Sequence, residues 1–125
     1  MNKNEFELII TIVNKGFADF VIDASRDAGA TGGTIINGRG TGVHENESFL
    51  GVNIQPEKEI VITLVKKENK TTIMQEICDR TKLQEHGKGI CFSMPVNKVA
   101  GITMFQDDKF KKVSPKDEDD KKEEK

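Results

Sequence analysis

The segment EIVITLVK, residues 59–66, decides the fold of this chain. Aliphatic or β-branched side chains fill both sets of its alternate positions, which is typical of a β-strand covered on both faces or nearly so. Residues 6–13 have the same character and predict a first strand. Shorter strands are expected at residues 34–36 and at residues 90–94, where Pro95 ends the run. The sequence therefore predicts four strands.

Two helices are predicted between these strands. Apolar side chains, Phe20 among them, recur at helical spacing over residues 17–28, with charged side chains on the other face. A second helix, capped by Thr71 or Thr72, is expected to end near Arg80. The resulting order is βαββαβ. It predicts an α+β, ferredoxin-like fold, in which a four-stranded antiparallel sheet carries both helices on one face.

Length and composition suit one domain followed by a charged tail. The chain has 125 residues, 35% of them hydrophobic, and a single domain is expected at residues 1–106. Residues 107–125 consist mainly of Lys, Asp and Glu. Burying the few apolar side chains of this segment would not offset the conformational entropy that the chain loses on ordering. We therefore predict that the segment is a disordered tail.

Charge and targeting signals restrict the partners and the location. The formal net charge of −2 and the isoelectric point near 5.7 provide no field that would attract nucleic acid, so no nucleic-acid partner is expected. The N-terminus lacks the pattern of a signal peptide, and no apolar stretch approaches the ~20 residues that span a bilayer. Cys78 and Cys91 lie in apolar stretches and are interpreted as reduced, buried side chains. A cytoplasmic location is therefore expected.

Two glycine-rich segments are candidate anion-binding loops. NGRGTG, residues 37–42, opens a polar segment of about fifteen residues, longer than most connections between elements. HGKG, residues 86–89, precedes the fourth strand. Alternate glycines let backbone N–H groups approach an anion, and Arg39 or Lys88 would add positive charge. Each segment also fits a simple turn, and neither matches a P-loop.

Patterns for catalysis and metal binding are weak. No two residues among His44, His86, Cys78 and Cys91 have the close spacing of a structural zinc site. No Ser-His-Asp or Cys-His arrangement is evident either. We therefore predict that the protein is not an enzyme, and we assign no catalytic or metal-binding residue.

Three stretches resemble the nitrogen-regulatory PII family: GATGGTII at residues 29–36, the GRG loop at residues 38–40, and EIVITLV at residues 59–65. The resemblance covers about residues 6–102. In that family the segment after the second strand, here about residues 38–53, is the mobile T-loop, and the loop before the fourth strand is the B-loop. The resemblance implies a homotrimer that binds ATP or ADP in clefts between subunits and contacts a membrane transporter or an enzyme through the T-loop. It implies these ligand-binding residues: Thr31, Gly38, Arg39, Gly40, Leu64, Gly87, Lys88 and Gly89.

The chain departs from the family pattern in its basic residues. The family's B-loop ends in Gly-Asp-Gly-Lys, whereas residues 87–90 read GKGI, which leaves Lys88 as the candidate phosphate ligand. The family's pair of arginines after the fourth strand is replaced by NKVAGI, residues 97–102, in which only Lys98 is basic. Because the chain has no tyrosine, its T-loop cannot carry tyrosine uridylylation. The expected ligand is therefore a nucleotide or another anionic metabolite.

The leading hypothesis is a PII-like trimeric sensor that regulates a partner protein through its T-loop. One alternative is a CutA-like metal-binding trimer, suggested by the two histidines. Another is an acylphosphatase-like enzyme, although that chemistry needs an arginine after the first strand, where residues 14–16 read NKG. Arg39 and Lys88 are further predicted to converge on one anion, because their loops are expected at the same end of the sheet.

Overall fold

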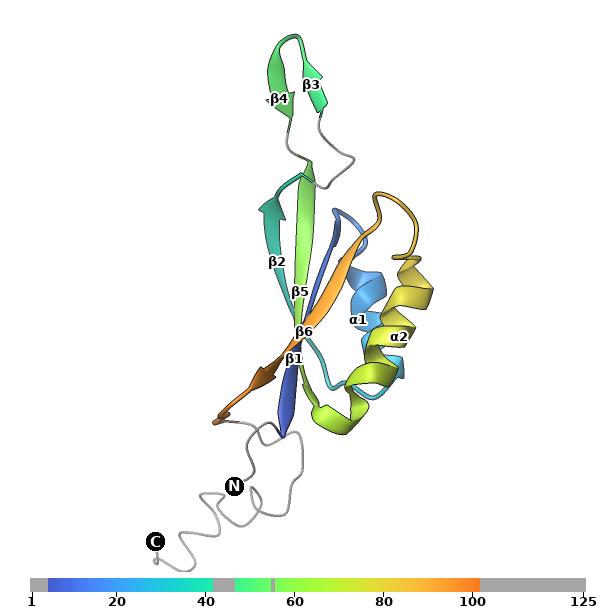
Figure 1. The fold of residues 1–125 in the computed structure, drawn as a ribbon, viewed down its shortest axis with the longest axis vertical. Helices are drawn as coiled ribbons and strands as arrows, with labels where there is room; N and C mark the ends of the chain where they lie inside the picture. The colour runs from blue at the N-terminus through green and yellow to red at the C-terminus, as the bar shows by residue number, and fades with distance from the viewer. Residues whose placement is uncertain (1–4, 42–46, 55, 102–125) are drawn as a thin grey trace, which may run out of the picture.

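A four-stranded antiparallel sheet, ordered β2-β5-β1-β6, organises the chain (Figure 1). These strands span Phe6–Asn14 (β1), Thr34–Arg39 (β2), Glu57–Lys66 (β5) and Gly89–Val96 (β6). The structure is a computed structural model that describes residues 5–41, 47–54 and 56–101. The predicted domain boundary at residue 106, the predicted tail at residues 107–125, and His44 lie outside the described residues.

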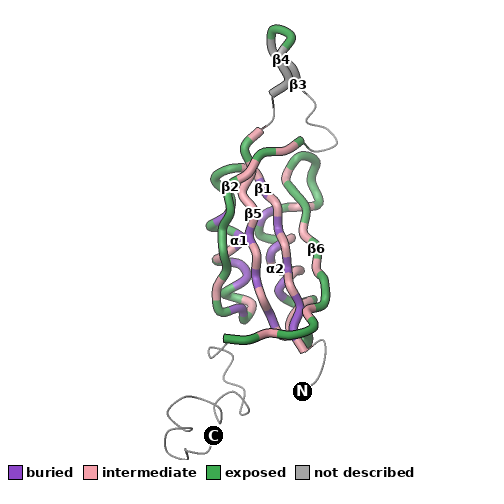
Figure 2. Tube along the Cα trace, turned by 90° about the vertical axis from the view of Figure 1, so that its left-hand side faces the viewer, coloured by how far each residue is buried: buried purple, intermediate pink, exposed green. Residues whose placement is uncertain are grey.

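Both helices pack on one face of this sheet. They are α1, Ala18–Asp27, and α2, Lys70–Thr81, the latter preceded by a short 3₁₀ turn, η1, at Lys67–Asn69. Buried residues alternate along β1 and β5 and line the sides of the helices that face the sheet (Figure 2). Among the described residues, no helix is long and apolar enough to cross a membrane. The ferredoxin-like fold predicted from the sequence is confirmed.

The core lies between the sheet and the helices. Alternate residues of the two central strands point into it, because successive side chains of a strand face opposite sides of the sheet. The cluster consists of Ile9, Val13, Ala18, Val21, Ala24, Ala30, Val61, Val65, Ile73 and Ile77. Cys91 packs against this cluster and Cys78 is half-buried, so the expectation of two fully buried cysteines is only partly met.

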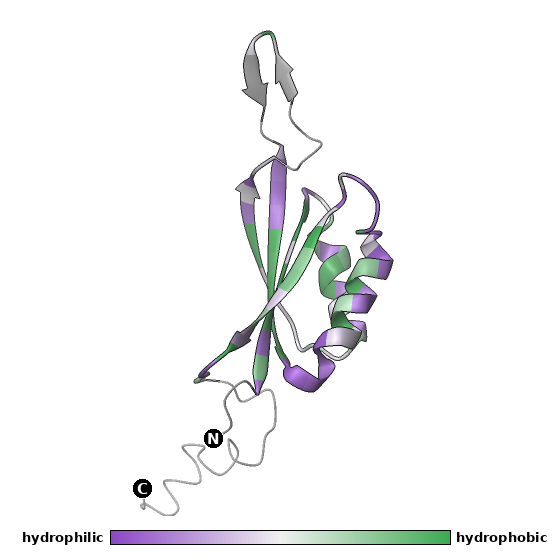
Figure 3. Cartoon of the chain, in the orientation of Figure 1, coloured by the Kyte–Doolittle hydropathy of each residue, from purple (hydrophilic) through white to green (hydrophobic). Residues whose placement is uncertain are grey.

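No helix among the described residues covers the other face of the sheet (Figure 1), and the strands are hydrophobic along much of their length (Figure 3). The register places the members of this face opposite one another, for example Ile10 opposite both Ile62 and Phe92. Phe92 and Met94 are 36% and 43% exposed. The apolar residues of this open face include Leu8, Ile10, Ile12, Ile36, Ile60, Ile62, Leu64, Ile90, Phe92, Met94 and Val96.

Several element boundaries differ from the sequence-based expectation. The second strand continues from residue 36 to Arg39, since Asn37 to Arg39 keep pairing with β5. The fourth strand continues through Pro95, which lies opposite Glu7. Because β6 is an edge strand, one of its sides forms no ladder hydrogen bonds and a proline is tolerated there. Phe20, expected on the apolar face of α1, is 53% exposed.

The long segment between β2 and β5 contains regular structure that the sequence did not predict. β3, Glu47–Phe49, and β4, Val52–Ile54, form a two-stranded antiparallel sheet of their own. They are joined by Leu50 and Gly51, whose φ angles of 52° and 81° are both positive, as in the tight turns of hairpins. This hairpin projects beyond the end of the main sheet (Figure 1).

Candidate functional site

One end of the main sheet gathers the loops that the sequence singled out. Arg39, the last residue of β2, lies opposite Glu57, the first residue of β5. The next residue, Lys58, lies opposite Asn14 at the end of β1. On the other side of β1, Val13 lies opposite Gly89, where β6 begins. The predicted location of both glycine-rich segments at the same end of the sheet is therefore correct.

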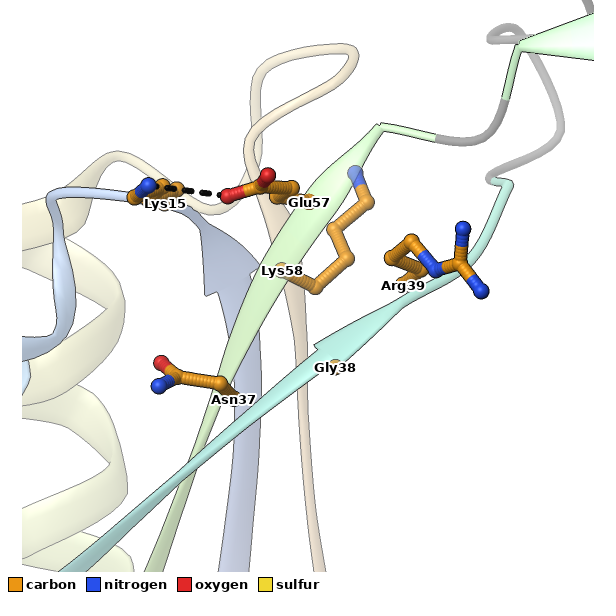
Figure 4. A pocket seen from close by; sticks show the side chains of 6 residues that line it. All are labelled: Lys15, Asn37, Gly38, Arg39, Glu57 and Lys58. Atoms are coloured by element: carbon orange, nitrogen blue, oxygen red, sulfur yellow. Dashed lines mark ion pairs between the residues drawn. The ribbon is translucent and has the colours of Figure 1, made fainter.

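A depression of about 340 Å³ lies at this end, where the hairpin segment leaves and rejoins the sheet (Figure 4). Its floor is formed by the paired ends of β2 and β5, and the turn after β1 closes one side. The lining residues are Lys15, Asn37, Gly38, Arg39, Glu57 and Lys58. We call this depression the basal pocket.

Most of the charged side chains that line the basal pocket are cationic. Three of its lining side chains are cationic, those of Lys15, Arg39 and Lys58, against the single carboxylate of Glu57. The Lys15 ammonium lies 2.9 Å from the Glu57 carboxylate. That hydrogen bond, and then the opposite charge, lower the pKa of Glu57 and raise the pKa of Lys15. The other two cationic side chains of the lining are those of Arg39 and Lys58.

Backbone hydrogen bonds hold the rim of the pocket in place. The Gly40 N–H donates to the Pro56 carbonyl at 3.2 Å, which closes the stem of the projecting segment. The Lys15 N–H donates to the Glu57 carbonyl at 3.2 Å, which ties the turn after β1 to the start of β5. The pocket is therefore built on paired strand ends rather than on an isolated loop.

Asn14 joins the pocket to the loop before β6. The Lys58 ammonium donates to Oδ1 of Asn14 at 2.7 Å, and Nδ2 of Asn14 donates to the Gly87 carbonyl at 2.8 Å. One side chain thus contacts both the β5 side of the pocket and the second glycine-rich segment.

Lys88 occupies a different place from Arg39. Its ammonium lies 5.9 Å from the centre of the Phe17 ring, and Phe17 lies next to Phe20 with 5.8 Å between ring centres. Arg39 and Lys88 belong to opposite edges of the sheet, three strand spacings or roughly 14 Å apart. Within one chain the two residues are therefore not neighbours, and their convergence on one anion stays a prediction that requires a second subunit.

The other predicted ligand residues are distributed as follows. Gly38 lines the basal pocket and Gly40 follows at its rim, whereas Gly87 and Gly89 flank Lys88. Thr31 lies before the start of β2, at the opposite end of that strand from Arg39. Leu64 lies on the open face of β5, seven positions or about 23 Å from Glu57. A single chain does not bring this whole set together.

Sequence reasoning missed Asn14, Lys15, Glu57 and Lys58 as site residues. Lysines and glutamates are common in the chain, and nothing local distinguishes these four. The available signal was the pairing of the first and third predicted strands, which would have placed residues 14 and 15 beside residues 57 and 58.

Cys78 and Cys91 are half-buried free thiols in the described part of the chain. Burial raises the pKa of both thiols, Cys78 and Cys91, so they are held in the protonated form. Within residues 5–41, 47–54 and 56–101, no three His, Cys, Asp or Glu side chains are grouped so that they could hold a metal ion.

Comparisons with known proteins agree with this architecture. The family model described as nitrogen regulatory protein P-II matches residues 6–104. Among solved structures, the crystal structure of Arabidopsis thaliana PII bound to citrate matches with a TM-score of 0.59. The sequence identity is 22%, and the match covers 80% of this chain and 82% of that chain, so it shows a shared fold. No curated protein sequence matches the chain.

Proposed function

The chain belongs to the nitrogen regulatory protein P-II family, and from this premise we propose that it is a trimeric sensor of a nucleotide or another anionic metabolite. The ligand binds at a cleft between subunits and changes how the T-loop, residues 38–53, contacts a partner protein. The protein performs no catalysis. The partner is a membrane transporter or an enzyme.

The observation that carries this proposal is the charge of the basal pocket at the root of the projecting hairpin. Among its described lining residues, three have cationic side chains and one has a carboxylate, a composition that suits an anion. Gly38 lies between Asn37 and Arg39 on the pocket wall, and a Cβ there would only touch Ile60 Cδ1 at 3.5 Å. Gly40, at the rim, has open space that lets a ligand approach the backbone. An anion bound there would contact both strands from which the hairpin emerges.

Two further points support the ligand class and the site. The solved structure with the same fold is bound to citrate, a carboxylate anion. Of the residues predicted to bind the ligand, Gly38 and Arg39 line the pocket and Gly40 lies at its rim. We propose that Thr31, Leu64 and the segment Gly87 to Gly89 complete the cleft from neighbouring subunits.

The open face of the sheet supports the trimer. It presents apolar side chains from all four strands that no element of the same chain covers among the described residues. Soluble domains seldom leave a contiguous apolar face of this kind exposed, because its burial stabilises association. We propose that the open faces of three copies pack together, that residues 1–106 form the associating domain, and that residues 107–125 remain a solvated tail.

Isothermal titration of the protein with ATP, ADP, AMP, cyclic dinucleotides and citrate tests this function. We expect saturable binding of at least one nucleotide, and weaker binding at high salt because the contact is electrostatic. Absence of heat with every nucleotide removes the nucleotide version. Absence of heat with citrate as well contradicts an anion site at the basal pocket.

A further inference from the structure

Phe17 presents an aromatic ring to the lysine of the second glycine-rich segment. The Lys88 ammonium lies 5.9 Å from the centre of this ring, at the outer end of the ~6 Å range of cation–π contacts. Phe17 is 40% exposed although its side chain is large and apolar, and Lys88 is half-buried. The contact joins the turn that follows β1 to the loop that precedes β6.

Hydrogen bonds fix the backbone that carries the Phe17 ring. The Phe17 N–H donates to the Asn14 carbonyl at 3.1 Å and closes a tight turn, in which Gly16 has a φ angle of 99°. The N–H groups on either side of it, those of Gly16 and Ala18, both donate to Oε1 of Glu59 at 3.0 Å. The ring therefore stands on a part of the chain that is held before, at and after Phe17.

The backbone at Lys88 is held by a weaker hydrogen bond. Its N–H donates to the Glu85 carbonyl at 3.4 Å, which is longer than the usual ~2.7–3.2 Å. A lysine side chain has many rotamers, and restricting it when a ligand binds costs conformational entropy. A contact that restricts Lys88 before the ligand arrives reduces this cost. The Phe17 ring provides such a contact.

An aromatic ring restricts an ammonium without cancelling its charge. The attraction arises from the quadrupole of the ring, which has no net charge. A carboxylate would neutralise the lysine instead, as Glu57 does for Lys15. An ammonium that lies over a ring still has N–H donors that point away from it, and these can contact an anion. Phe17 is therefore a suitable neighbour for a lysine that binds an anion.

We propose that Phe17 is a positioning residue that holds the Lys88 ammonium where it contacts the anionic group of the bound ligand. Phe20, whose ring centre lies 5.8 Å from that of Phe17, flanks the ring. The inference deepens the proposed function and rests on it, because Lys88 is there a ligand of the anion.

Two measurements on the full chain test this role. In the NMR spectrum of the ligand-free protein, the ring current of Phe17 should shift the ε-methylene protons of Lys88. Phe17→Leu should move these protons toward the position of a solvated lysine, whereas the protons of Lys82, at the end of α2, stay unchanged. Isothermal titration with ATP as the probe should show about twofold to fivefold weaker binding for Phe17→Leu. Phe17→Tyr, which keeps the ring, should bind as the parent does.

A double-mutant cycle shows whether Phe17 acts through Lys88. In a Lys88→Met chain, Phe17→Leu should weaken ATP binding no further. An equal loss in both backgrounds would mean that the ring touches the ligand directly, and the positioning role would be wrong. Unchanged Lys88 protons in Phe17→Leu would show that the contact does not form in solution.

Failure of the inference is distinguishable from failure of the proposed function. If the parent binds ATP and Phe17→Leu binds it equally well, Phe17 has no positioning role and the proposed function stands. If the parent gives no heat with ATP, the proposed function fails for this nucleotide, and the role of Lys88 as its ligand fails with it.

Discussion

The carboxylate of Glu59, in β5, accepts a hydrogen bond from the backbone N–H of Ala18 at 3.0 Å. Glu59 thus caps helix α1 although it lies forty-one positions further along the chain. The same Oε1 accepts the Gly16 N–H, also at 3.0 Å. Phe17, at the N-cap position of α1, provides no side-chain hydrogen bond of its own. A negative charge from β5 therefore satisfies N–H groups that the helix leaves unpaired and complements the positive end of its dipole.

Replacing Glu59 with alanine should lower the free energy of unfolding by about 1–2 kcal/mol, because the helix loses its capping acceptor. Urea unfolding at a fixed protein concentration measures the change. Glu59→Gln keeps an oxygen acceptor without the charge and should fall between the alanine variant and the parent. The control is Glu68→Ala, at an exposed position, and equal midpoints for the two alanine variants would show that the cap contributes nothing.

Gly89→Ala should be among the most damaging substitutions in the chain. Gly89 has a φ angle of 139°, and a Cβ added there would collide with the Ile12 carbonyl oxygen of the neighbouring strand. We expect the free energy of unfolding to fall by more than about 2 kcal/mol, because a Cβ disfavours this backbone conformation and disrupts the pairing of β1 with β6. Gly32→Ala, with open space and an ordinary φ angle, should unfold at the parent's temperature. A parent-like melting temperature for Gly89→Ala would be inconsistent with this strand geometry.

The Lys15–Glu57 pair predicts a displaced titration at the pocket. Its hydrogen bond and charge lower the pKa of Glu57 below the ordinary value of 4.5, so the contribution to stability is present above that pH and is lost as pH falls through the lowered pKa. The pKa of Lys15 is raised above 10.5, so its contribution is lost only as pH rises through that raised value. Carboxyl chemical shifts followed by NMR should give a Glu57 midpoint below 4.5 in the parent and one nearer 4.5 in Lys15→Met. Identical midpoints would mean that the pair does not form in solution.

A charge on the open face should dissociate the trimer. Phe92 lies opposite Ile10 near the middle of that face, and Phe92→Glu would bury a carboxylate without a partner in the assembly. Light scattering should give three times 13.9 kDa for the parent and a smaller mass for the variant. Phe20→Glu, at an exposed position on α1 away from the open face, should leave the mass unchanged. A parent mass of 13.9 kDa would contradict the trimer itself.

Arg39→Ala and Lys88→Ala test whether the two glycine-rich segments share one ligand. Each variant should weaken binding of the nucleotide identified by titration by about 1.5–3 kcal/mol, because each removes a charge-assisted contact. The melting temperature should barely change, since neither side chain belongs to the core. Lys112→Ala, in the predicted tail, should bind as the parent does. If both loop variants also bind like the parent, the shared site is wrong and the segments are turns.

The order of elements followed from local patterns. Helical spacing along residues 17–28 predicted a buried side of α1, since periodicity of this kind requires no knowledge of the partner. Residues 59–66 are apolar or β-branched at both sets of alternate positions, so only the structure showed that Val61, Thr63 and Val65 are the buried set. The sequence did not reveal the hairpin at residues 47–54, whose turn places Leu50 in a conformation that usually needs glycine or asparagine.

The sequence by itself determined the fold class, the two glycine-rich segments and their location at one end of the sheet. Only the tertiary structure decided which side chains meet there. Lys58 reaches Asn14 across forty-four positions, and Asn14 reaches Gly87 across seventy-three, because strand register and packing bring distant chain segments together. The local sequence around each residue does not predict such contacts. The strand order also places Arg39 and Lys88 at opposite edges of the sheet, because β2 and β6 are its two edge strands.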